Sequence, residues 1–239
     1  MASNLPSQCC VNFTFHAGEP KGSIEEIYGN KVTYVSGDVS NKIVIIFTDI
    51  YGVRFKNVQL IADRFAAEGY YALIPDLFQG EIFTAGSPIE ELYAFVGKHA
   101  PNATTIASDF ISKLKADIPE AKIHGIGHCF GAKVVIPGLS ESGLVDVGAV
   151  AHPSLVTIEE VSQIKKPLLI SAAELDPAFT VELRHLTEAK LIEIGAEYQI
   201  TLFAGVEHGF AVKGDMEVPK IRKAAEKVIL DQLYFFDNY

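Results

Sequence analysis

Short apolar runs alternate with longer amphipathic stretches from about residue 31 to the end of the chain. The apolar runs have the length and β-branched content of buried strands, and they cover residues 31–35, 43–47, 71–74, 123–126, 147–151, 168–172 and 197–203. Apolar positions recur at helical spacing between them, in residues 58–66, 105–114, 182–194 and 219–236. This alternation predicts an α/β fold in which helices flank a mostly parallel central sheet.

The first 25 residues do not follow this pattern. They contain Gly18, Pro20 and Gly22 and no periodic apolar run, which predicts an irregular N-terminal arm. The whole chain has 239 residues, a length that one α/β domain can occupy, and it has no internal repeat. We therefore expect a single domain over residues 1–239, with the arm at residues 1–25.

Composition and charge indicate which binding partners and which cellular location to expect for this protein. Hydrophobic residues make up 49% of the chain, enough for a large core, and the formal net charge of -10 argues against nucleic acid or an anionic membrane as partner. No signal peptide is evident, and no apolar run reaches the roughly 18 residues that span a bilayer. Three cysteines, two of them adjacent, do not form a disulfide framework. These features predict a cytoplasmic protein.

The strongest chemical signal is a glycine-rich turn after the predicted strand 123–126. The sequence Gly-His-Cys-Phe-Gly at residues 127–131 has the spacing of a nucleophile elbow, with Cys129 in the position of the nucleophile. Glycines are needed because larger side chains would collide with this tight turn, and the following helix dipole favours a thiolate. The turn leaves the N–H of Phe130 free to donate to an oxyanion. The alternative is a buried structural cysteine. His128 is expected to point away from the nucleophile.

Two further residues complete the predicted catalytic group. Asp176 and His208 each follow a predicted strand, and the chain order of nucleophile, acid and histidine is the one usual for this kind of elbow. His208 would act as the base, and Asp176 would fix its tautomer. Glu174 is a rival for the acid, but Asp176, just before a proline, is better placed in a turn. The sequence therefore predicts a triad of Cys129, His208 and Asp176.

We predict no metal site and no cofactor. His124 and His128 are four residues apart, but on a strand and its turn this spacing separates them by roughly 13 Å. The remaining histidines do not cluster with cysteines or with each other.

Several motifs together resemble the dienelactone hydrolase family, and most closely its fungal cytosolic branch. The matching segments are Asp-Ile-Tyr-Gly-Val at 49–53, Pro-Asp-Leu-Phe at 75–78, Gly-His-Cys-Phe-Gly at 127–131, Ala-Ala-Glu-Leu-Asp at 172–176 and His-Gly-Phe-Ala at 208–211. The likeness extends over residues 30–235 and implies an α/β-hydrolase fold. It also implies that Asp49 tunes the thiol and that the N–H groups of Ile50 and Phe130 form the oxyanion hole. The better-known bacterial members have the longer glutamate where this chain has Asp49.

The resemblance fails at the substrate pocket. The bacterial enzymes hold a substrate carboxylate with two arginines, whereas Gly80 and Val212 stand at those positions here, with Lys213 nearby. The dienelactone of chlorocatechol degradation is therefore not the expected substrate. A less charged pocket is expected instead, formed by Tyr51, Phe78, His152 and Phe210.

Cys9 and Cys10 leave two interpretations open. Adjacent cysteines on an arm could reach a neighbouring thiol or oxidise under stress, or they could be unpaired thiols without a role.

The function that the residues favour is a cofactor-independent carboxylic-ester hydrolase. It would act on small esters, lactones or thioesters through a cysteinyl acyl intermediate, as a monomer or homodimer. One alternative is a non-catalytic binding or regulatory protein on the same fold. Another is an amidotransferase-like enzyme with a cysteine elbow, although Phe210 stands where glutaminases usually carry a glutamate.

Overall fold

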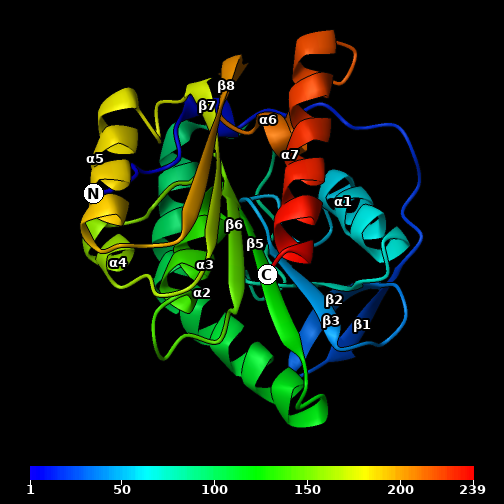
Figure 1. Ribbon diagram of the computed structural model, residues 1–239. Coiled ribbons are helices and arrows are strands. Elements are labelled where there is room, and N and C mark those ends of the chain that lie inside the picture. Colours follow the sequence, from blue (N-terminus) through cyan, green and yellow to red (C-terminus); the bar gives the residue numbers. More distant parts are fainter.

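The computed structural model describes residues 1–239 and contains one eight-stranded sheet in the order β1-β2-β4-β3-β5-β6-β7-β8 (Figure 1). The strands are β1 (Ser23–Ile27), β2 (Asn30–Ser36), β3 (Lys42–Phe47), β4 (Tyr71–Pro75), β5 (Lys122–His128), β6 (Val147–Ala151), β7 (Leu168–Leu175) and β8 (Tyr198–Glu207). The β1–β2 and β2–β4 pairs are antiparallel, and every other pair is parallel. The mostly parallel sheet predicted from the sequence is confirmed.

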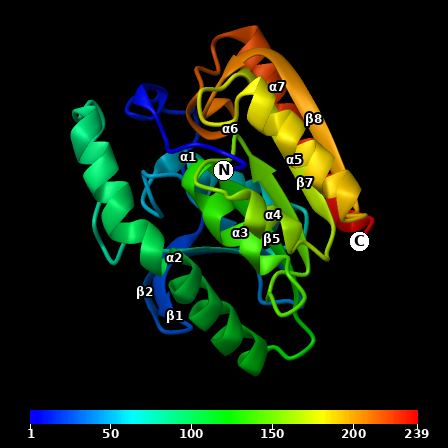
Figure 2. The ribbon, with the colours of Figure 1, turned by 90° about the vertical axis from the view of Figure 1, so that its left-hand side faces the viewer.

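Helices cover both faces of this sheet. They are α1 (Lys56–Ala67), α2 (Ile89–Asp117), α3 (Ala132–Gly138), α4 (Ile158–Ser162), α5 (Val181–Glu193), α6 (Phe210–Lys213) and α7 (Pro219–Asp237), with short 3-10 turns η1 (Gln8–Cys10) and η2 (Cys129–Gly131). Helices α1 and α7 lie on one side of the sheet and α2 to α5 on the other (Figures 1 and 2). None of these helices combines the length and the apolar character needed to cross a bilayer.

The central strands are buried because both of their faces are covered. Every residue from Ile43 to Phe47 in β3 is buried, as are all five residues of β6. This is the environment that continuous apolar runs predict. Helix α1 buries one apolar stripe, including Val58, Ile61 and Phe65, and exposes its other side.

The structure differs from the sequence-based elements mainly in their lengths. Helix α2 begins at Ile89, far before the predicted 105–114, and it continues through Pro101, a residue that locally opposes a helix. Strand β1 lies partly within the predicted irregular arm. Strands β7 and β8 both extend beyond their predicted ends, so Asp176 and His208 follow them directly.

The candidate residues gather at one edge of the sheet. β3 and β5 are neighbours and parallel, and β4, which follows β3 in the chain, lies on the opposite side of β3 from β5. Such a reversal of strand order creates a crevice at the carboxyl ends of the strands. Asp49, Cys129, His152, Asp176 and His208 all lie just beyond carboxyl ends of parallel strands.

The N-terminal arm is anchored across this same edge. The N–H groups of Ala2 and Ser3 donate to the Val156 carbonyl, and the Thr14 N–H donates to the Lys213 carbonyl. Cys10 and Val11 are buried. The arm therefore belongs to the packed structure, although only η1 within its first 22 residues is regular.

Asn57 fastens the arm to the body of the protein. Its fully buried amide donates to the carbonyls of Thr14 and Val212, both at 2.8 Å, and its carbonyl accepts from the N–H of His16 at 2.9 Å. One side chain on α1 thus holds two arm residues and α6 together.

We expect Asn57→Ala to lower the free energy of unfolding by about 2–4 kcal/mol, because the substitution leaves several buried backbone groups without partners. Urea unfolding measures this change. Lys56→Ala is the matched control, since Lys56 makes only an exposed ion pair with Glu19 on the same arm and should change stability by less than about 1 kcal/mol. Equal losses of stability in the two variants would contradict the conclusion that Asn57 fastens the arm to the body of the protein.

Candidate active site

The backbone at Cys129 has the strained conformation of a nucleophile elbow. Its φ of 51° lies in the left-handed region, which non-glycine residues rarely adopt. A Cβ added at Gly131 would lie 2.0 Å from the carbonyl oxygen of Phe47 on β3, and one at Gly127 would lie 2.7 Å from the Gly131 carbonyl oxygen. Both glycines are therefore required by close backbone contacts.

Asp176 and His208 form a buried pair beside this turn. His208 Nδ1 lies 2.8 Å from Oδ1 and 2.9 Å from Oδ2 of Asp176, and neither side chain is exposed. Asp176 Oδ1 also accepts from the N–H groups of Ala178 and Phe179, which fixes the carboxylate in place. The rival Glu174 accepts from the Gly205 N–H and is solvent-exposed. Asp176 is thus the carboxylate that orients His208.

Burial and charge act in opposite directions on His208. Burial lowers its pKa, but the negative charge of Asp176, with contributions from Cys10 and the hydrogen bonds, outweighs it and raises the pKa to about 10. The pair therefore stabilises the protonated imidazolium, the form a nearby thiolate favours.

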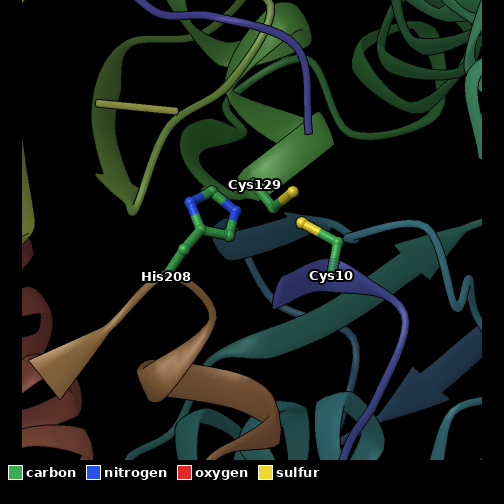
Figure 3. A group of neighbouring side chains, drawn as sticks. All are labelled: Cys10, Cys129 and His208. Atoms are coloured by element: carbon green, nitrogen blue, oxygen red, sulfur yellow. The ribbon is translucent and has the colours of Figure 1, made fainter. Parts of the chain in front are cut away.

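Cys129 lies close to His208 but without a hydrogen bond to it. The sulfurs of Cys129 and Cys10 and a ring nitrogen of His208 lie within 4.8 Å of one another (Figure 3). The expectation that no histidine clusters with cysteines is therefore wrong for His208, because the fold brings together residues that are far apart in sequence. His208 Nε2 is buried and has no partner. The hydrogen-bond partner of the Cys129 thiol is instead the Ser154 hydroxyl, at 3.4 Å.

Ser154 and Cys10 are two residues that sequence reasoning did not assign to the site. Ser154 follows β6, and its N–H also donates to the Cys129 carbonyl. Its position after a strand, two residues beyond His152, was the available signal. For Cys10 the only signal was the open possibility that an arm cysteine reaches another thiol.

The predicted thiol-tuning and oxyanion residues are buried at the end of β3 and at the elbow. Asp49 Oδ1 accepts from the Tyr51 N–H at 3.0 Å, and Oδ2 is buried without a partner. Burial raises the Asp49 pKa. No hydrogen bond joins Asp49 to Cys129, and the Ile50 N–H donates to no group of the chain. Phe130 is buried in η2 directly after Cys129.

A cavity of about 420 Å³ opens beside His208, between the arm and the loop after β8. Arm residues 9 and 12–14 line one wall, and residues 205–210 and 213–215 line much of the other. Of the four side chains predicted to contact substrate, only Phe210 lines this cavity.

The other three predicted substrate contacts are buried. The His152 ring packs edge-on to His208 at 4.9 Å, and burial lowers its pKa well below the usual value. The ring of Phe78 packs against that of Phe130, with 5.1 Å between the ring centroids. Tyr51 donates from its hydroxyl to the Cys10 carbonyl at 2.8 Å. In this conformation none of the three borders the cavity.

Val212 and Gly80, which stand where the bacterial enzymes have arginines, lie in different environments. Val212 is fully buried, and the Gly80 N–H donates to Asp76. Lys213 lines the cavity and donates from Nζ to the Cys9 carbonyl. It is therefore a cation on the wall of the cavity, anchored to the arm.

The arm closes over Cys129. Only 2% of Cys129 and 4% of His208 are exposed, and Cys129 does not line the cavity. Tyr51 and Lys213 hold the arm over the site through the backbone carbonyls of Cys10 and Cys9.

Comparisons with known proteins identify a family and several relatives that this chain resembles. The sequence model of the dienelactone hydrolase family matches residues 31–239. "Hydrolase tropI" of Talaromyces stipitatus is 39% identical over 99% of this chain and 98% of its own length. "Hydrolase pyvD" of Aspergillus violaceofuscus is 37% identical over all of this chain and 99% of its own.

The fold is also found in solved structures. A Klebsiella pneumoniae protein proposed to be a dienelactone hydrolase superposes with a TM-score of 0.75 at 17% identity, covering 92% of this chain and 98% of its own. A dienelactone hydrolase-like promiscuous phosphotriesterase from metagenomic libraries gives 0.67 at 18% identity over 87% and 92%. The predicted α/β-hydrolase fold is confirmed.

The elbow glycine can be tested directly. Gly131→Ala should lower the free energy of unfolding by about 1–3 kcal/mol or more, because its Cβ would collide with the Phe47 carbonyl. Gly97→Ala in α2 is the control, since its Cβ would meet nothing within 4 Å and should stabilise the helix by up to about 1 kcal/mol. Urea unfolding compares them, and a Gly131→Ala protein as stable as the control would contradict the close contact.

The raised pKa of His208 predicts how the Asp176 pair contributes to stability. The folded state holds the imidazolium proton up to about pH 10, whereas an unfolded histidine loses it near pH 6.5. The stabilisation is therefore fully present below about pH 6.5 and is lost as the pH rises towards 10. We expect the difference in unfolding free energy between wild type and Asp176→Asn, measured in reductant and chelator, to shrink across this range. A difference that grows with pH would show that His208 is neutral in the folded protein.

Proposed function

This chain belongs to the dienelactone hydrolase family and is a hydrolase of ester bonds, and from that premise we propose that Cys129, His208 and Asp176 form its catalytic triad. The substrate is a small ester, lactone or thioester, and the reaction passes through a cysteinyl acyl intermediate. No cofactor takes part in the proposed steps.

One observation carries this proposal. The strained turn presents Cys129 close to a histidine that a buried carboxylate already orients. Two of the three side chains come from loops after β7 and β8, far from the elbow in sequence. Nucleophile, base and orienting acid in such proximity are the components of covalent acyl transfer.

In the first half-reaction the Cys129 thiolate attacks the carbonyl carbon of the substrate. The N–H groups of Ile50 and Phe130 stabilise the resulting oxyanion, and the free Ile50 N–H supports this role. When the tetrahedral intermediate collapses, His208 donates its proton to the departing alkoxide or thiolate. A lactone substrate would remain attached at this stage as an opened hydroxyacyl chain.

In the second half-reaction water hydrolyses the thioester. Neutral His208 removes a proton from the water as it attacks, and the Cys129 thiolate leaves with the carboxylic acid released. Asp176 stabilises the imidazolium formed in this step. Ser154 acts on the thiol by its hydrogen bond, and the family resemblance supports a tuning role for the buried Asp49.

The cavity beside His208 supports a small substrate. Its volume of about 420 Å³ is near the lower end of the range for small-molecule sites. Phe210 supplies an apolar contact there, and Lys213 supplies one positive charge in place of the two missing arginines. Because the arm separates the cavity from Cys129, we propose that residues 9–13 shift when substrate enters.

The state of the cysteines supports a cytoplasmic location for the enzyme. All three cysteines are free, which fits a reducing cytoplasm. Its partner is the small-molecule substrate, and it acts as a monomer or homodimer.

The proposal predicts that Cys129→Ala lowers kcat/KM for activated esters by at least about 10³-fold, because the nucleophile is removed while the fold is kept. A panel of aryl esters, thioesters and small lactones, assayed with both proteins, provides the measurement.

Cys9→Ala is the matched control, since Cys9 lies on the arm rather than at the elbow and should stay within about 10-fold of wild type. Turnover that survives in Cys129→Ala would exclude Cys129 as the nucleophile. An absence of turnover on the whole panel, together with a Cys129 thiol inert to alkylation, would favour a binding protein.

A further inference from the structure

Cys10 has no part in the proposed hydrolysis, yet it lies buried against the reacting groups. It comes from η1 on the arm, Cys129 from the elbow and His208 from the loop after β8 (Figure 3). All three are at least 96% buried, and their ligand atoms lie within 4.8 Å of one another. We propose that Cys10, Cys129 and His208 bind one Zn²⁺ ion, which inhibits the enzyme by occupying its nucleophile and its base.

His208 has the arrangement of a metal-binding histidine. Its Nε2 is buried without a partner and faces the two sulfurs, while its Nδ1 is held by Asp176. A histidine that binds zinc through one ring nitrogen almost always donates the N–H of the other to a carboxylate, a carbonyl or water, and this hydrogen bond fixes the ring orientation and the tautomer. The carboxylate that orients His208 for catalysis therefore also orients it towards a metal.

The spacing of the three side chains fits tetrahedral zinc after a small movement. Zn–S bonds of about 2.3 Å place two sulfurs about 3.8 Å apart, so sulfurs at most 4.8 Å apart need to approach by about 1 Å or less. Cys10 can make this movement because it belongs to a three-residue turn on the arm. The three side chains leave the fourth position of a tetrahedral site for a water molecule or an anion.

The ligand set selects the kind of ion. Two thiolates and one neutral imidazole suit zinc and other borderline or soft ions, whereas Mg²⁺ and Ca²⁺ require oxygen ligands. Binding releases the thiol protons and the Nε2 proton of the His208 imidazolium to solvent, and two thiolates balance the charge of a dication. The metal and its three ligands then carry no net charge, and the buried carboxylate of Asp176 keeps its hydrogen bonds to His208 and to the N–H groups of Ala178 and Phe179.

Bound zinc would block both catalytic groups at once. The Cys129 sulfur could not attack a carbonyl, and His208 Nε2 could not accept a proton. This inhibition rests on the proposed function, whereas metal binding itself does not.

Cobalt(II) gives a readout of the site that is independent of activity. Reduced, metal-free protein should bind one Co²⁺ per chain with the thiolate charge-transfer band and the intense visible bands of tetrahedral coordination. Zn²⁺ should displace it, protect Cys10 and Cys129 from alkylation, and abolish ester hydrolysis until a chelator is added.

Cys10→Ser should weaken Zn²⁺ binding by more than about 100-fold. The ester hydrolysis of this variant, measured first without metal, should not be inhibited when Zn²⁺ is added. His208→Gln should lose the tetrahedral cobalt spectrum, and Cys9→Ser, which changes the adjacent thiol, should keep wild-type zinc affinity. A cobalt spectrum that persists in Cys10→Ser, or that disappears in Cys9→Ser, would overturn the site. A normal spectrum in a protein that hydrolyses nothing would refute the hydrolase proposal and leave the metal site standing.

Discussion

The left-handed backbone of Cys129 can form only because the glycines of the elbow let the chain close against β3, with Gly131 packed onto the carbonyl of Phe47. A non-glycine residue in this region costs on the order of 1–3 kcal/mol, and the surrounding buried strands supply the packing that maintains it. The strain projects the sulfur from the carboxyl edge of the sheet. The loops after β7 and β8 reach the same edge because both strands are parallel to β5. His208 therefore lies close to the thiol, with Asp176 behind it, although both residues are far from Cys129 in sequence.

The N-terminal arm covers the side chains that gather at this edge of the sheet. Asn57, Tyr51 and Lys213 each bond to arm backbone, and together they hold Cys10 over the thiol and the imidazole. The consequence is that the proposed catalytic groups lie close together but are covered by the arm. A covering segment that contributes its own thiol can also determine which ions reach the nucleophile. Catalysis and metal binding would thus compete for the same two atoms, Cys129 Sγ and His208 Nε2.

Much of this arrangement could be predicted from the sequence, because it depends on local pattern and on chain order. The spacing of Gly127 and Gly131 indicated the elbow, and the strand endings indicated Asp176 and His208 as candidates. The length of α2 could not be predicted, since Pro101 opposes a helix locally and tertiary packing overrides it. The contacts of Ser154 and Cys10 depend on how a loop and an arm pack across the sheet edge, which no local periodicity encodes. The placement of Tyr51 and Phe78 away from the cavity has the same non-local origin.

In the proposed mechanism an acyl group passes through Cys129. Rapid mixing of metal-free protein with an activated ester, followed by acid quenching and mass spectrometry of the digested chain, tests it directly. We expect a transient acyl adduct on the peptide that contains Cys129, formed before steady-state turnover and removed by water. Hydrolysis without any adduct at Cys129, or with the adduct at Cys10 instead, would contradict it.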